Sequence, residues 1–219
     1  MDIYNIKETE TGLNIEGIPD AVAIVKVDGR IAQRISDLSL HKTELSFALE
    51  CVTLLESHET HSILTEALWN TAITSFCKCF GRGVRSPLSE RKILKNKPPE
   101  ALEAFRYFQA LRNKHLIHDE NTYSQSLPGA AINNGSKAYK IEKIVCFNAQ
   151  SVTNTKEDRA NLSLLIADSL DWVLSEFDNL CNQLTVDLEK ESYKTLSCRP
   201  PLHYFMPKLN EINKPRNKH

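Results

Sequence analysis

The chain has 219 residues, of which 41% are hydrophobic and 25% are charged, and its formal net charge is −1. This length and composition are typical of a soluble globular protein that can bury a substantial core without disulfide bonds. A net charge so close to zero excludes the global basic field that many nucleic-acid-binding proteins use, so contact with RNA or DNA needs a local basic patch.

No segment of the sequence has the features of a secretory signal or of a membrane span. The start lacks a basic and then apolar leader, and no apolar run reaches the ~18 residues that a membrane helix needs. The six cysteines are scattered, and several lie in apolar runs, which favours buried thiols in a reducing compartment. We therefore expect a cytoplasmic protein that does not contact a membrane.

Residues 1–30 are the least helical part and are expected to form an irregular N-terminal extension. Within this extension, residues 21–27 are rich in β-branched side chains and precede Asp28-Gly29, a turn signal. A short strand, or one half of a hairpin, is therefore predicted there.

Helical periodicity dominates the rest of the chain. Apolar residues recur at spacings of three and four over residues 31–55 and 62–80, which predicts two amphipathic helices. Residues 82–98 form a basic connector, interpreted as a solvated linker or, alternatively, as a patch that contacts RNA. Pro98 and Pro99 suit the first turn of the next helix, predicted to run to about residue 116, and the longest helix is expected over residues 156–191.

A small β-hairpin is predicted between the last two of these helices. Residues 140–148 alternate well enough for a strand, and residues 130–132 can pair with them across the Asn134-Gly135 turn. Pro128-Gly129 is a second turn signal, so the hairpin is expected at about residues 129–150.

These elements predict a mainly α protein: a four- to five-helix bundle with a hairpin insertion. The expected organisation is an extension over residues 1–30, a bundle over residues 31–191 and a loose C-terminal tail over residues 192–219.

The densest chemistry lies at the predicted end of the third helix, in the run Arg112-Asn113-Lys114-His115-Leu116-Ile117-His118-Asp119. A guanidinium that is always charged and an imidazole that titrates near neutral pH suit phosphodiester cleavage. In an unbroken α-helix, Arg112 and His118 would lie roughly 120° apart around the axis and about 9 Å apart along it. They would converge only if the helix ends or bends between them, or if a second copy of the motif faces the first.

The Arg112-Asn113 pair followed after a gap by His118 resembles the RNxxxxH signature of the HEPN superfamily, whose members are all-α bundles with this motif late in a core helix. His115 lies too close to Arg112 to be the motif histidine. The resemblance in architecture covers about residues 31–191.

The resemblance implies a homodimeric, metal-independent endoribonuclease without a cofactor. It assigns His118 as general acid or base, Arg112 as the group that holds the scissile phosphate, and Asn113 as an orienting hydrogen-bond partner. Lys114 and His115 become candidates for further contacts with the RNA. Many similar proteins are toxins or abortive-infection effectors of antiviral defence, so an antitoxin or another defence protein is a possible partner.

Other interpretations of this segment stay open. Arg, Lys and His at the C-terminal end of a helix also complement its dipole and cap its carbonyls. Some HEPN domains keep the fold and lose catalysis, so a binding or interaction module is the main alternative. Two minor alternatives are a metal-dependent phosphohydrolase using His118-Asp119 with His41, His58 or His61, and a zinc site formed by His115, His118 and cysteines.

Overall fold

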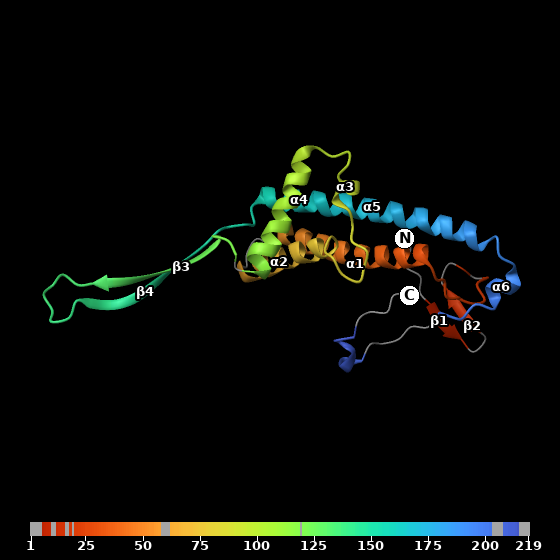
Figure 1. The fold of residues 1–219 in the computed structure, drawn as a ribbon, viewed down its shortest axis with the longest axis horizontal. Helices are drawn as coiled ribbons and strands as arrows, with labels where there is room; N and C mark the ends of the chain where they lie inside the picture. Colours follow the sequence, from red (N-terminus) through yellow and green to blue (C-terminus); the bar gives the residue numbers. More distant parts are fainter. Residues whose placement is uncertain are drawn as a thin grey trace. The chain divides into compact units, whose positions relative to one another are not determined.

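A computed structural model describes residues 6–9, 12–15, 18, 20–57, 62–118, 120–202 and 208–214, and it is mainly helical (Figure 1). The elements follow in this order: β1 (Ile6–Thr9), β2 (Gly12–Ile15), α1 (Arg30–Ser57), α2 (Ser62–Lys78), α3 (Glu90–Ile93), α4 (Pro99–Leu111), the π-helical turn η1 (Arg112–Ile117), β3 (Ser124–Ile132), β4 (Ile141–Gln150), α5 (Lys156–Leu188), α6 (Tyr193–Ser197) and the 3₁₀ turn η2 (Leu209–Glu211). The mainly α class and the helices predicted from periodicity are confirmed.

The chain divides into two compact units. The boundary between them falls within α1 and within α5, so each of these helices belongs partly to unit 1 and partly to unit 2. Unit 1 consists of Met1–Thr43, Gly81–Leu88 and Ser169–His219, and unit 2 consists of Glu44–Phe80 and Ser89–Asp168. The run that carries Arg112 and His118 lies in unit 2, together with the whole of α2, α4 and the β3–β4 hairpin.

The core of unit 2 is built where α2 packs against α4 through aromatic rings. Phe105 of α4 lies with its ring centroid 4.7 Å from that of Phe80 and 5.9 Å from that of Phe76, and Phe108 meets Trp69 at 5.9 Å. Edge-to-face pairs of this kind stabilise the interface beyond the area they bury. Because Phe105, Phe108 and Leu111 recur on the buried side of α4, they hold the residues that follow Leu111 against α2.

The connector between α2 and α4 is more ordered than a solvated linker. It contains α3, and its apolar residues Leu88 and Ile93 are buried, at 3% and 7% exposure. Most of its lysines and arginines are exposed, as expected of a solvated linker, but the two buried apolar side chains anchor the segment.

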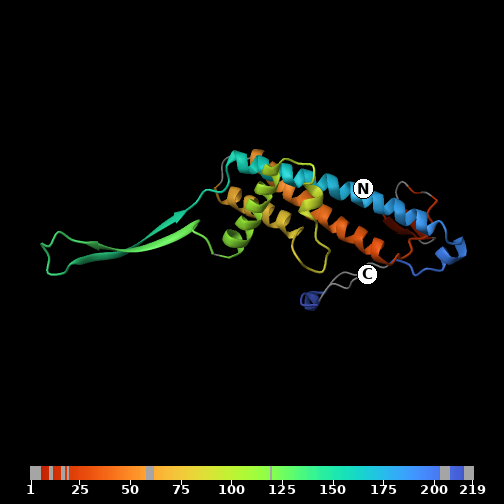
Figure 2. The same cartoon turned by 45° about the horizontal axis from the view of Figure 1, so that its top comes forward.

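The hairpin is confirmed, but it is longer than predicted. Strand β3 begins at Ser124, and Pro128-Gly129 lies inside the strand instead of forming a turn. Pro128 is tolerated because β3 is an edge strand, where one side of the backbone needs no partner. Figures 1 and 2 show the two strands as a ribbon leading out from the helices of unit 2, and most of its side chains are exposed, including Leu127 and Phe147.

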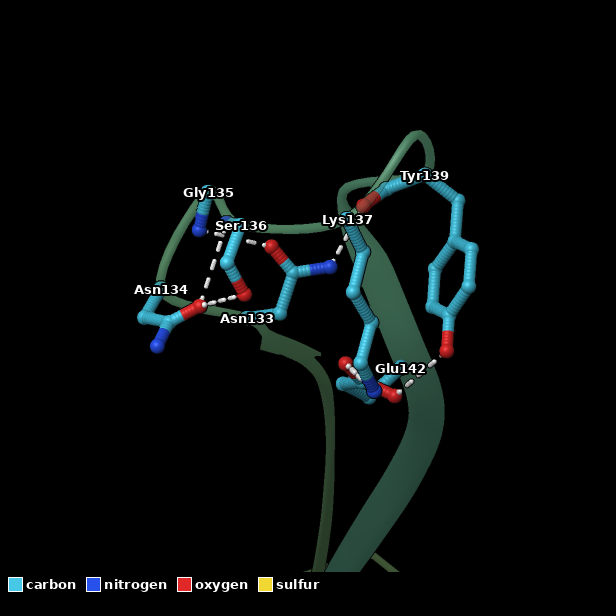
Figure 3. A network of polar contacts seen from close by, with 7 residues as sticks. All are labelled: Asn133, Asn134, Gly135, Ser136, Lys137, Tyr139 and Glu142. Carbon is cyan, nitrogen blue, oxygen red and sulfur yellow. Dashed lines mark hydrogen bonds and ion pairs between the residues drawn. The ribbon is translucent and has the colours of Figure 1, made fainter.

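Polar contacts order the tip of this hairpin (Figure 3). Asn133 Oδ1 accepts a hydrogen bond from the backbone N–H of Gly135 at 2.9 Å, and Gly135 has φ +81°, which favours glycine. Lys137 pairs with Glu142 at 2.7 Å and lies over the ring of Tyr139. The predicted Asn-Gly turn is therefore formed, within a longer loop.

The strand predicted over residues 21–27 was wrong for most of its length. Only Val25 forms a β-bridge, and its partner is Pro201 in the C-terminal tail. The bridge is flanked by hydrogen bonds from Lys26 N to Pro200 O at 2.8 Å and from Leu202 N to Ile24 O at 2.9 Å. The tail is consequently not simply loose: it contains α6 and supplies the partner that the local sequence lacked.

The expectation that the cysteines are buried holds for Cys51, Cys77 and Cys79, whereas Cys146 and Cys198 are exposed. In the described part of the chain, no helix is both long and apolar enough to cross a membrane.

Candidate functional site

The Arg112–Ile117 segment is a π-helical turn that continues directly from α4. Such turns are rare and occur frequently at functional sites, because they change the direction in which side chains leave a helix. The helix ends at Ile117, and His118 is extended, with φ −123° and ψ 141°. One of the two conditions for bringing Arg112 and His118 together, a helix that ends between them, is therefore met.

Arg112 is half-buried, and its guanidinium is only partly used. Nη1 donates a hydrogen bond to Asn113 Oδ1 at 2.7 Å, while the buried Nε has no hydrogen-bond partner among the described residues. Burial raises the pKa of the neighbouring Cys77 to about 12, although the charge of Arg112 opposes this shift. Cys77 therefore stays a neutral thiol, and within the described residues no carboxylate neutralises Arg112.

His118 is exposed directly after this turn, and Asn113 is exposed at its start. The backbone N–H of Glu120 donates to the carbonyl of Lys114 at 3.0 Å, which closes a loop that carries His118 over the helix end. An imidazole on such a loop is open to a large ligand. No described hydrogen bond or ion pair joins His118 to Arg112 or Asn113 within one chain.

Lys114 and His115 lie at two different cavities. Lys114 lines a small one, about 110 Å³, with Tyr107, Asn121 and Tyr123. Burial, and then Asp158, raise the pKa of Tyr107 to about 12, so its hydroxyl stays neutral. The ring of His115 meets that of Tyr123 at 5.6 Å, so this tyrosine links η1 to the base of the hairpin.

The larger cavity, about 650 Å³, is lined by His115 and by residues that the sequence interpretation did not identify. They come from α2, from the end of β4 and the segment after it, and from the start of α5: Thr65, Glu66, Trp69, Asn70, Gln150, Ser151, Val152, Thr153, Asn154 and Arg159, with Leu116 from η1. They are distant in sequence and form no motif. Only the packing of α2 against η1 could reveal them.

Hydrogen bonds hold the walls of this cavity. Trp69 Nε1 donates to Thr153 Oγ1 at 3.3 Å, and Arg159 Nε donates to Asn154 Oδ1 at 2.6 Å. Arg159 Nη1 also donates to the carbonyl of Leu55 at 3.1 Å. The segment after β4 is thus fixed to both α2 and α5, so the cavity is a preformed feature of unit 2.

The buried polar cluster of unit 1 has a structural role. Asp37 Oδ2 accepts from the backbone N–H of Ser86 at 2.9 Å, and the carbonyl of Ser86 receives Arg34 Nη1 at 2.8 Å and lies 3.0 Å from His41 Nε2. These contacts hold the Gly81–Leu88 segment on α1. Among the described residues, no group of three or more His, Cys, Asp or Glu side chains is arranged to hold a metal ion, while His58, His61 and Asp119 lie outside those residues.

Comparison of the chain with protein-family models, with curated proteins and with solved structures finds no match. Its function must therefore be argued from its residues and their geometry.

Proposed function

We propose that this protein is a metal-independent endoribonuclease of the HEPN type. The observation that carries the proposal is the π-helical turn, which contains the Arg112-Asn113 pair and ends directly before the exposed His118. A partly buried guanidinium with unused donors and an exposed imidazole are the two groups that phosphodiester cleavage needs.

The reaction is a transesterification within the RNA. The 2′-hydroxyl attacks the adjacent phosphorus and loses its proton to one imidazole, while the bond from phosphorus to the 5′-oxygen breaks and that oxygen takes a proton from a second imidazole. Arg112 binds the phosphate and stabilises the charge that builds on its oxygens. The products carry a 2′,3′-cyclic phosphate and a 5′-hydroxyl, and no cofactor is required.

A homodimer supplies both imidazoles, because each copy contributes one His118. The proposal thus accounts for the lack of a direct contact between His118 and Arg112 within the chain. Exposed apolar side chains of the hairpin, Leu127, Ile132, Ile144 and Phe147, provide a surface that a second chain can cover. We place the protein in the cytoplasm, in defence or growth control, as a toxin or abortive-infection effector with an antitoxin or defence protein as a further partner.

The alternative is a catalytically inactive binding module with the same fold. It is favoured by the exposed hairpin, since an uncovered apolar ribbon is more typical of a protein-binding surface than of a nuclease. In that case, Arg112 and His118 cap the end of α4 and bind a ligand without cleaving it.

The test is incubation of purified protein with a labelled single-stranded RNA in EDTA, beside Arg112→Ala, His118→Ala and Arg106→Ala. Arg106 is an exposed arginine of α4 and serves as the matched control. We expect cleavage by the wild type and by Arg106→Ala, with 2′,3′-cyclic phosphate ends, and a loss of roughly 10²-fold or more in the other two variants.

Three results would contradict the proposal. Full activity of a folded His118→Ala protein would remove its chemical basis, and inhibition by EDTA would favour the metal-dependent phosphohydrolase. If the folded wild type binds RNA without cutting it, the binding module is the correct function. Growth arrest on expression that His118→Ala relieves would independently support an enzyme.

A further inference from the structure

The 650 Å³ cavity beside η1 has the properties of a ligand site. Its volume lies within the ~300–1,000 Å³ that small-molecule sites occupy. It opens against the same turn that carries Arg112, because His115 and Leu116 form part of its wall. A ligand in this cavity therefore contacts the turn that carries Arg112, although Arg112 itself does not line the cavity.

Two polar side chains of α2 that line this cavity, Glu66 and Asn70, form no hydrogen bond with another described residue, and Glu66 is exposed. His115 lines the cavity from η1, while its Nδ1 is closed to solvent and has no partner among the described residues. Glu66 and Asn70 are four residues apart, so they lie on the same face of the helix. A carboxylate, an amide and an imidazole that line one cavity form an arrangement that a ligand with several donors and acceptors can satisfy.

The positive charge needed to offset Glu66 is present in the same wall. Arg159 lines the same cavity as Glu66, and its side chain is held by Asn154 and the carbonyl of Leu55. A ligand that carries a phosphate and a ring with hydrogen-bond donors can therefore place the phosphate at Arg159 and the ring donors at Glu66. A nucleotide of a single-stranded RNA has this chemistry, because its base can leave the stack and be read along its edge.

We propose that this cavity binds a guanine base next to the scissile phosphate, an inference that rests on the proposed ribonuclease function. Guanine alone among the RNA bases presents two adjacent donors, N1–H and the N2 amino group, on its Watson–Crick edge, beside the O6 acceptor. The Glu66 carboxylate accepts from both donors, and the Asn70 amide donates to O6. His115 completes the site from the η1 side.

The chain thus combines cleavage with base selection. Bidentate contacts to a base discriminate by roughly 5- to 150-fold against the wrong base. Glu66 is a specificity residue and not a catalytic one, since it contacts the base and not the phosphate. Removal of its charge should change which sites are cut and leave the chemistry at His118 intact.

The experiment maps cleavage sites on an unstructured RNA of random sequence by sequencing the product ends, for wild type, Glu66→Gln and Glu103→Gln. Glu103 is an exposed glutamate of α4 outside the cavity and is the matched control. We expect guanine to be enriched about tenfold at one position flanking the wild-type cuts. Glu66→Gln should lose this enrichment while Glu103→Gln keeps it.

A uniform base profile for the wild type, or an unchanged guanine preference in Glu66→Gln, would overturn the inference while leaving the ribonuclease proposal in place.

A second measurement separates the two proposals if no RNA is cut. Fluorescence anisotropy with 2′-O-methyl pentanucleotides, which cannot be cleaved, compares a central G with A, C and U. Binding that is at least fivefold tighter for G and is lost in Glu66→Gln supports the base site without catalysis. Equal binding of all four contradicts it.

Discussion

Arg112 shows how position changes the role of a single residue. An arginine at a helix end usually extends into solvent and caps carbonyls, but here the side chain is half-buried beside a neutral thiol and leaves Nε without a partner. Because Nε is closed to solvent, a phosphate is held by the Nη donors that the bond to Asn113 leaves unused, and the permanent charge of the guanidinium strengthens these hydrogen bonds. This is the physical reason to place the phosphate at Arg112.

The burial of His41 predicts that the stability of the protein depends on pH. Burial lowers its pKa from the ordinary value, and the charges of Arg85 and Arg34 lower it further, whereas the Ser86 carbonyl and Asp37 oppose the shift. The His41 imidazole therefore binds a proton more readily in the unfolded chain than in the folded chain. The contribution of neutral His41 to the free energy of unfolding should be complete above the pKa of the unfolded chain, about 6.5, and should decrease as the pH falls below that value.

Thermal unfolding at pH 7.5 and pH 5 tests this expectation, with Tm falling by roughly 2–4 °C for each kcal/mol lost. His41→Gln keeps a donor for Ser86 and removes the titration, so its Tm should depend less on pH than that of the wild type. Equal pH dependence of the two proteins would show that His41 does not cause the loss.

At the scale of elements, the aromatic contacts between α2 and α4 support the π-helical turn. Phe105 contacts both Phe76 and Phe80, and it is 2% exposed. Because η1 follows α4 without a break, the position of Arg112 depends on this packing.

We expect Phe105→Ala to destabilise the protein by about 3–5 kcal/mol, since it leaves a cavity between two helices. Arg106→Ala, one residue further along and exposed, should stay within about 0.5 kcal/mol of the wild type. Urea denaturation measures both. A small effect of Phe105→Ala would mean that the rings do not hold α4 in place.

For the hairpin we expect the opposite result, a small loss of stability when it is shortened, because few of its side chains are buried. Replacement of residues 127–147 by Asn-Gly joins Ser126 to Asn148, which are already paired, and keeps the base of the ribbon beside Tyr123. The shortened protein should keep its helical circular dichroism and a Tm within roughly 2–4 °C of the wild type. A large loss of either would show that the ribbon supports the helices.

At the scale of the whole molecule, the proposed reaction needs two copies of the chain. Sedimentation should therefore give a dimer at the concentrations used for cleavage, and specific activity should fall on dilution as the dimer dissociates. The shortened hairpin variant should show whether the exposed ribbon contributes to this association. A wild-type monomer that still cuts RNA would contradict the shared site.

Sequence patterns determined the local features of this protein. Periodicity predicted α1, α2, α4 and α5, and the Asn134-Gly135 turn predicted a hairpin, because both signals depend on residues a few positions apart. The motif residues were also visible, because Arg112, Asn113 and His118 are close in the chain. Their functional role stays a prediction.

Only the tertiary structure decided the contacts between distant residues. It paired Val25 with Pro201, buried Leu88 and Ile93 within a basic connector, and turned His115 toward a cavity lined by Glu66 and Asn70. No local pattern specifies such contacts, since they follow from how whole helices pack. The chemistry of the motif could therefore be proposed from the sequence, whereas its surroundings, and with them the proposed choice of base, depend on the fold.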